Sequence, residues 1–126
     1  MSIQPRSLDE IFSAIERPFS PVLAASINDY DIKAVRVQGD FVWHAHADTD
    51  ELFWVSGGEL LIDLREDGAE RTITLGPGAI ATVPAGIEHR TRSAEGADVV
   101  MIEPAGTLNT GDATDLPDGI RPTTAR

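Results

Sequence analysis

The three histidines of this 126-residue chain are its only histidines, and all three lie at spacings typical of metal ligands. His44 and His46 are two residues apart, Glu51 follows shortly after them, and His89 comes from a distant part of the chain. On a β-strand, residues two apart point to the same face, so both imidazoles of the first pair can reach one point. Three imidazoles and one carboxylate suit a divalent transition metal such as Fe, Mn, Ni, Zn, Co or Cu.

Such a site can keep coordination positions open for water or a substrate. Glu51 is then either a permanent ligand or, by dissociating, a possible general base. Asp50 is an alternative carboxylate ligand beside it. The chain has no cysteine. Thiolate metal sites, thiol catalysis and disulfide scaffolds are therefore excluded, and any metal must be held by nitrogen and oxygen atoms.

The formal charge of −11, from 10 basic and 21 acidic residues, disfavours nucleic acid and anionic membrane surfaces as partners. No apolar run approaches the roughly 20 residues that a membrane helix needs. The first residues show no charged segment followed by an apolar stretch, so no secretory signal is visible. We expect a cytoplasmic protein whose partner is a small molecule.

The elements that must position these side chains are mostly strands. Residues 7–16 predict a short helix with a capping box of Ser7 and Glu10, ended by Pro18. Runs rich in Val, Ile, Thr and aromatic residues then predict nine short strands and a sandwich or barrel. Gly57 and Gly58 predict a tight hairpin turn. The expected strands are 22–27, 32–38, 41–46, 51–56, 59–65, 70–75, 79–84, 88–93 and 98–103.

We divide the chain into an N-terminal helix and lead-in over 1–21, a barrel over 22–105, and an extended tail over 106–126. The tail is polar and rich in turn residues, so it either lies over the barrel or is partly disordered. Its candidate anchors are Leu108, Leu116 and Ile120.

Strand alternation also predicts the lining of a pocket around the histidines. The last strand leaves a choice, since either Val99, Met101 and Glu103 or Val100 and Ile102 face inward. The facing of Lys33, the only lysine, stays open. Trp43 and Trp54 are expected outside the barrel, in core packing under the helix or in a dimer interface. The predicted pocket lining is Val42, Phe53, Val55, Ile87 and Thr91, with Met101 in the first alternative for the last strand.

Two motifs now make a family resemblance specific. Gly39, His44, His46, Glu51 and Gly58 resemble the first cupin motif, with four residues between Gly39 and His44 where five are usual. The second cupin motif is matched farther along, with a serine where the family usually has asparagine. Its residues are Gly78, Pro84, Gly86, His89 and, in place of the asparagine, Ser93.

The chain thus resembles a single-domain cupin of the RmlC-like superfamily, close to the cupin 2 conserved barrel group, over roughly residues 30–104. The resemblance implies an all-β fold, a double-stranded β-helix or jelly roll, here with a short N-terminal helix. It implies that His44, His46, Glu51 and His89 bind a metal inside the barrel. It also implies a homodimer formed through an edge strand, for which 22–27 is the candidate.

Cupin membership does not define an activity, because the fold hosts isomerases, oxygenases, lyases and binding proteins. The apolar predicted lining favours a metal-dependent enzyme acting on a small enol, diketone or aromatic-like substrate. A sugar phosphate would need convergent Arg and Lys. The alternatives are a non-catalytic, metal-dependent binding protein for a small ligand, a sugar isomerase-like cupin, or a structural jelly roll with an empty site.

Overall fold

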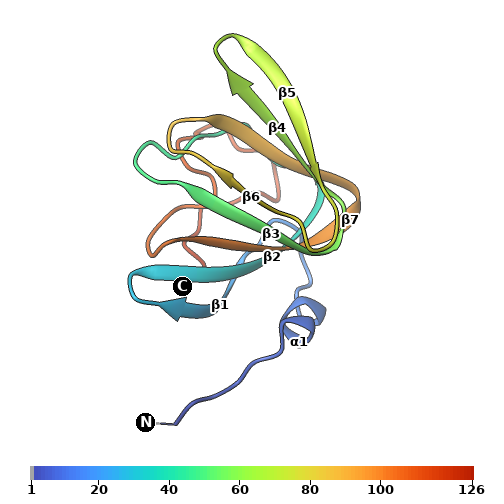
Figure 1. Cartoon of the computed structure of the whole chain (residues 1–126), viewed down its shortest axis with the longest axis vertical. Coiled ribbons are helices and arrows are strands. Elements are labelled where there is room, and N and C mark those ends of the chain that lie inside the picture. Colours follow the sequence, from blue (N-terminus) through green and yellow to red (C-terminus); the bar gives the residue numbers. More distant parts are fainter. Residues whose placement is uncertain (1) are drawn as a thin grey trace.

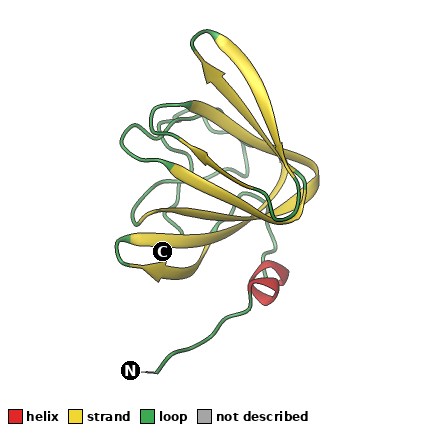
Figure 2. Cartoon of the chain, in the orientation of Figure 1, coloured by secondary structure: helices red, strands yellow, loops and turns green. Residues whose placement is uncertain are grey.

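The computed structural model describes residues 2–126 and consists almost entirely of strands (Figure 1, Figure 2). Its helix is shorter than predicted, although Ser7 caps it as expected, since the Ser7 hydroxyl accepts from the Glu10 amide at 3.3 Å. No helix among residues 2–126 is long and apolar enough to cross a membrane. The elements are α1 (Leu8–Ser13), β1 (Val22–Ile27), β2 (Tyr30–Asp40), β3 (Glu51–Gly58), β4 (Leu60–Glu66), β5 (Ala69–Leu75), β6 (Ile80–Val83) and β7 (Glu88–Pro104).

All strand pairs are antiparallel, and the long strand β7 joins the two layers of a jelly roll. The hydrogen-bonded order is β1-β2-β7-β3-β6, and β4 pairs with β5 and with the first part of β7. Figure 1 shows the β4–β5 hairpin and the β1–β2 hairpin on opposite sides of the barrel. The predicted all-β jelly roll with a short N-terminal helix is confirmed.

Three predicted details of the strands are wrong. The ranges 88–93 and 98–103 belong to one strand, β7, so residues 2–126 form seven strands where nine were predicted. Residues 41–46 do not form a strand, and only His44 makes an isolated bridge, to His89. Gly57 and Gly58 are not a hairpin turn, because β3 does not pair with β4. They pair with β7 instead, at a β-bulge, and a Cβ on Gly58 would lie 2.2 Å from the Gly96 carbonyl oxygen. The glycine is required there by the close approach of two backbones.

The barrel interior and the outer face under the helix are separate apolar clusters. Val99 and Met101 face the interior, whereas Val100 and Ile102 face α1, which settles the choice left open for the last strand. Trp54 also packs under the helix, outside the barrel as expected. Trp43 lies elsewhere on the outside, where the guanidinium carbon of Arg65 sits 3.7 Å above its ring.

The segment after β7 has no regular secondary structure and lies against the barrel. Its backbone is held to the segment between β2 and β3, since the Ala45 amide donates to Asp112 at 2.8 Å and the Asp112 amide donates to Ala45 at 3.1 Å. At its end, Arg126 donates to Asp31 of β2 at 3.0 Å. Of the three candidate anchors, Ile120 is buried, Leu116 is half-buried and Leu108 is exposed.

Candidate metal centre

Backbone hydrogen bonds bring the two histidine segments together at one end of the barrel. The His44 amide donates to the His89 carbonyl at 2.9 Å, and the His89 amide donates back at 2.8 Å. The Gly86 amide donates to His46 at 2.8 Å, so the turn that precedes β7 is tied to the same segment. Glu51 opens β3 directly beside them. His44 and His46 thus sit on an irregular segment that is positioned by its neighbours, rather than on a strand of their own.

The four predicted ligands form one compact, buried cluster. Each offers one donor atom, and these atoms all lie within 4.8 Å of one another. The Glu51 Oε1 atom is 3.3 Å from the Nε2 atom of His46 and 3.2 Å from that of His89. None of the four side chains is more than 7% exposed. The structure therefore brings together a set of groups able to hold a metal ion.

The imidazoles of His44 and His89 are oriented in the same way. In each, the Nδ1 atom is 2.9 Å from the carbonyl oxygen of the residue two positions earlier, Val42 and Ile87 respectively. A carbonyl oxygen can only accept, so each Nδ1 carries the proton and each Nε2 has a free lone pair. A second hydrogen bond of this kind is the usual way in which proteins orient a metal-binding histidine.

Burial changes the acid–base behaviour of the cluster. Burial, followed by the nearby His89, lowers the pKa of His44 to about 4, so its imidazole is neutral near pH 7. Burial alone would raise the pKa of Glu51, but the neighbouring imidazoles of His46 and His89 outweigh it and hold the pKa below its usual range. The site thus offers a neutral imidazole and an ionised carboxylate, the forms in which these groups bind metals.

The cluster fits a transition metal by a further observation. The Nε2 atom of His46 is buried and has no hydrogen-bond partner within residues 2–126. A buried polar atom without a partner is costly, and an ion at the centre of the cluster would supply one. Asp50, the alternative carboxylate, is exposed and accepts instead from the Ala85 amide at 2.9 Å. It lies outside the cluster.

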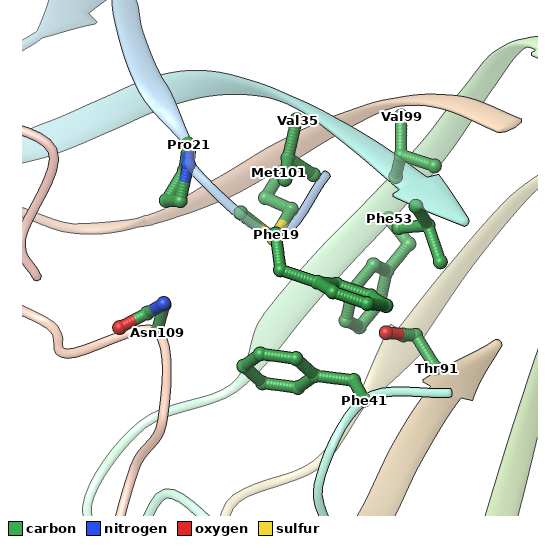
Figure 3. A pocket seen from close by; sticks show the side chains of 10 residues that line it. Phe19, Pro21, Val35, Phe41, Phe53, Thr91, Val99, Met101 and Asn109 are labelled. Atoms are coloured by element: carbon green, nitrogen blue, oxygen red, sulfur yellow. The ribbon is translucent and has the colours of Figure 1, made fainter. Parts of the chain in front are cut away.

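An apolar cavity of about 30 Å³ lies beside the cluster and opens to solvent. Two of its walls are aromatic rings that touch the histidines. The ring of Phe41 is 5.4 Å from that of His44, and the ring of Phe53 is 6.2 Å from that of His89. Figure 3 shows the rings of Phe19, Phe41 and Phe53 grouped together, with Asn109 apart from them. The lining is Phe19, Pro21, Val35, Val37, Phe41, Phe53, Thr91, Val99, Met101 and Asn109.

The cavity differs in part from the predicted lining. Phe53, Thr91 and Met101 line it, but Val42 and Val55 do not. Val55 is fully buried in the barrel core. Val42 is only half-buried, because residues 41–46 are not a strand and do not alternate as one.

Ile87, also predicted to line the cavity, packs against the core. Phe41, rather than Val42, lines the cavity. Phe19 and Asn109 reach the cavity from outside the barrel strands, and no local pattern in the sequence marks them.

A buried charge pair next to Glu51 was not predicted from the sequence. Lys33 and Glu103 face the barrel interior, and the Lys33 Nζ atom donates to Glu103 Oε1 at 2.8 Å. Burial, followed by the charge of Glu51, raises the pKa of Glu103 to about 8. Inward alternation along the last strand was the only signal for Glu103, and it was one of two alternatives.

Comparison with known proteins supports the cupin resemblance. Residues 33–104 match the Cupin_2 family, described as the cupin domain. The uncharacterised protein YdbB of Bacillus subtilis is 39% identical over 69 residues, which are 55% of this chain and 58% of YdbB. The chain therefore spans less than two thirds of that relative.

Comparison with solved structures also supports the cupin fold. A protein of Shewanella frigidimarina containing a cupin-2 domain is 40% identical, with a TM-score of 0.73 over 79% of this chain and 93% of that one. Hydroquinone 1,2-dioxygenase of Sphingomonas sp. TTNP3, in complex with 4-nitrophenol, has a TM-score of 0.73 over 80% of this chain and 32% of that one. The hydroquinone 1,2-dioxygenase PnpCD in complex with Fe³⁺ has the same TM-score over 82% and 33%. Both dioxygenases are 22% identical to this chain and show a shared fold.

Proposed function

This chain belongs to the Cupin_2 family, and on that premise we propose that it is a metal-dependent enzyme acting on a small, mostly apolar organic molecule. His44, His46, Glu51 and His89 are the proposed ligands of one divalent transition metal. The observation that carries the proposal is that Phe41 and Phe53, two rings of the cavity wall, lie against His44 and His89. A small molecule in the cavity would lie beside the ion.

The substrate class that we propose is an enol, a diketone or an aromatic-like compound. No Lys or Arg lines the cavity within residues 2–126, so it offers no cation to a sugar phosphate. Three phenylalanine rings in the lining, those of Phe19, Phe41 and Phe53, favour flat, apolar groups. The shared fold of hydroquinone 1,2-dioxygenases, seen with Fe³⁺ and with 4-nitrophenol, supports this choice.

A bound divalent metal would supply Lewis-acid chemistry by polarising an oxygen of the substrate. The protein's own groups prepare that site. Hydrogen bonds from Nδ1 to the Val42 and Ile87 carbonyls hold His44 and His89 with Nε2 free. The phenyl rings exclude water from the side that faces the cavity. Glu51 is the proposed carboxylate ligand, because its pKa is held low enough to keep it ionised. If it dissociates from the ion, it is the possible general base.

Metal analysis of the purified, untagged protein tests the ligand set. We expect about one transition metal per chain, lost in the double variant His44→Ala/His89→Ala and strongly reduced in Glu51→Gln. Asp50→Asn is the matched control, because this neighbouring carboxylate binds the Ala85 amide outside the cluster. Wild-type protein that stays metal-free after reconstitution would contradict the proposed metal site.

Turnover is tested separately on the metal-loaded protein, with enols, β-diketones and dihydroxybenzenes, each with and without O₂. Consumption of one class, abolished in Glu51→Gln, is the expected result. Thermal stabilisation by such compounds without any turnover would instead identify a binding protein and refute the enzymatic part of the proposal.

A further inference from the structure

A row of charged side chains crosses the barrel interior at the end that holds Glu51. Asp31 of β2 pairs with Glu103 of β7. Leu52 of β3 pairs with Ile102 of β7, so the register places Glu51 next to Glu103 on the other side. Lys33 points inward two residues after Asp31. These four side chains are at most 2% exposed.

Nearly every charge in this row has an identified partner. Lys33 Nζ donates to Glu103 Oε1 at 2.8 Å and to the Thr107 carbonyl at 3.0 Å. Asp31 accepts from Arg126. The second oxygen of Glu103, Oε2, has no conventional donor within residues 2–126. The strand register sets the carboxyl group of Glu103 beside that of Glu51.

The position of Glu103 restricts the conformations that the Glu51 side chain can adopt. A glutamate side chain has several rotatable bonds, and a ligand that moves among rotamers binds an ion more weakly than one held in place. Glu51 directs Oε1 toward His46 and His89, while Glu103 lies beside it on the neighbouring strand β7. Glu103 in turn is fixed by Lys33, which is itself bonded to the main chain.

We infer that the buried Lys33–Glu103 pair positions Glu51 as a metal ligand. This inference rests on the proposed function, because it assumes that Glu51 binds the ion. A purely structural pair would behave differently. Buried ion pairs can often be replaced by apolar side chains of similar size without loss of stability. If the pair positions Glu51, an apolar replacement keeps the fold but weakens metal binding.

Cobalt affinity of the metal-free protein, measured against a competing chelator, tests the inference, and the visible spectrum of bound Co²⁺ reports the coordination geometry. We expect Glu103→Leu and the double variant Lys33→Met/Glu103→Leu to bind Co²⁺ about 10–100-fold more weakly, with an altered spectrum. Glu103→Gln keeps the polar contacts to Glu51 and Lys33, so it should stay within about threefold of wild type.

Asp31→Leu is the matched control, since it removes a buried carboxylate of the same row that is bonded to Arg126 rather than to Glu51. Its cobalt affinity should equal that of the wild type. Circular dichroism and urea unfolding identify the folded variants, and the double variant serves if Glu103→Leu alone does not fold.

The outcomes separate the two proposals. If wild-type protein binds no Co²⁺, the proposed function fails, and this inference fails with it. If wild type binds Co²⁺ and the folded double variant binds it equally well, only the positioning role is overturned. The role is also overturned if Glu103→Gln loses as much affinity as Glu103→Leu, or if Asp31→Leu loses as much as either.

Discussion

Replacing Gly111 with alanine should detach the C-terminal segment from the candidate metal ligands. A Cβ at this position would lie 2.4 Å from the Ala45 carbonyl oxygen and 3.0 Å from the Cδ2 atom of His44. The same Ala45 oxygen accepts the hydrogen bond from the Asp112 amide. The added methyl group therefore overlaps with the atom that holds the segment in place.

The size of the effect follows from two contributions. Gly111 has a φ of +52°, and a non-glycine residue in this region costs about 1 kcal/mol. Overlap with fixed neighbours costs about 1–3 kcal/mol more. The matched control is Gly106→Ala, whose φ of +89° is at least as unfavourable for alanine but whose Cβ would meet nothing within 4 Å. We expect Gly111→Ala to destabilise by about 2–4 kcal/mol and Gly106→Ala by about 1–2 kcal/mol.

Equilibrium urea unfolding, followed by the fluorescence of Trp43 and Trp54, measures the global effect. Hydrogen exchange at the Asp112 amide measures local detachment of the segment, which can occur while the barrel stays folded. Faster exchange at Asp112 in Gly111→Ala, and not in Gly106→Ala, is the expected result. Equal exchange and equal stability in the two variants would refute the close packing of the C-terminal segment on residues 41–46, which carry His44 and His46.

Two further predictions concern the fold and the pH response. Gly58→Ala should be about 2 kcal/mol more destabilising in urea unfolding than Gly68→Ala. Both glycines have nearly the same φ, +75° and +76°, but only Gly58 approaches another backbone. Equal losses of stability in the two variants would contradict the close approach and favour the hairpin turn that the sequence predicts. His44 in the unfolded chain takes up a proton near its ordinary pKa of 6.5, whereas the folded chain takes it up only near 4, so the contribution of His44 to the stability of the metal-free protein should be lost as pH falls from 6.5 to 4. The difference in pKa corresponds to about 3 kcal/mol of stability, and this pH-dependent loss should be absent in His44→Gln. The same pH dependence of unfolding in wild type and His44→Gln would contradict the burial of a neutral imidazole.

The four candidate ligands could be predicted from the sequence because their pattern is local. His44, His46 and Glu51 lie within one short segment, and Pro84 and Gly86 mark the turn before His89. A sandwich or barrel was predictable for a similar reason, since strand-forming runs and turn residues alternate along the chain. The resemblance to cupins then specified a jelly roll. Strand 22–27 was predicted with the bounds that the structure has.

Contacts between distant segments could not be predicted in this way. Strand alternation placed Val42 in the cavity, but residues 41–46 are held by His89 and Gly86 rather than by a neighbouring strand. Gly58 predicted a turn because glycine is favoured both in turns and where two backbones approach closely. Only the pairing of β3 with β7 distinguishes the two.

The sequence alone determined which side chains can bind a metal, because ligand type and spacing are properties of short segments. Tertiary structure decided what surrounds them. Strand register places Glu103 beside Glu51 and Lys33 within reach of Glu103, although Lys33 and Glu103 are 70 residues apart in the chain. The fold also brings Phe19 and Asn109 to the cavity from segments outside the barrel strands. Register and segment docking depend on the total burial of the barrel, which no short stretch of sequence encodes.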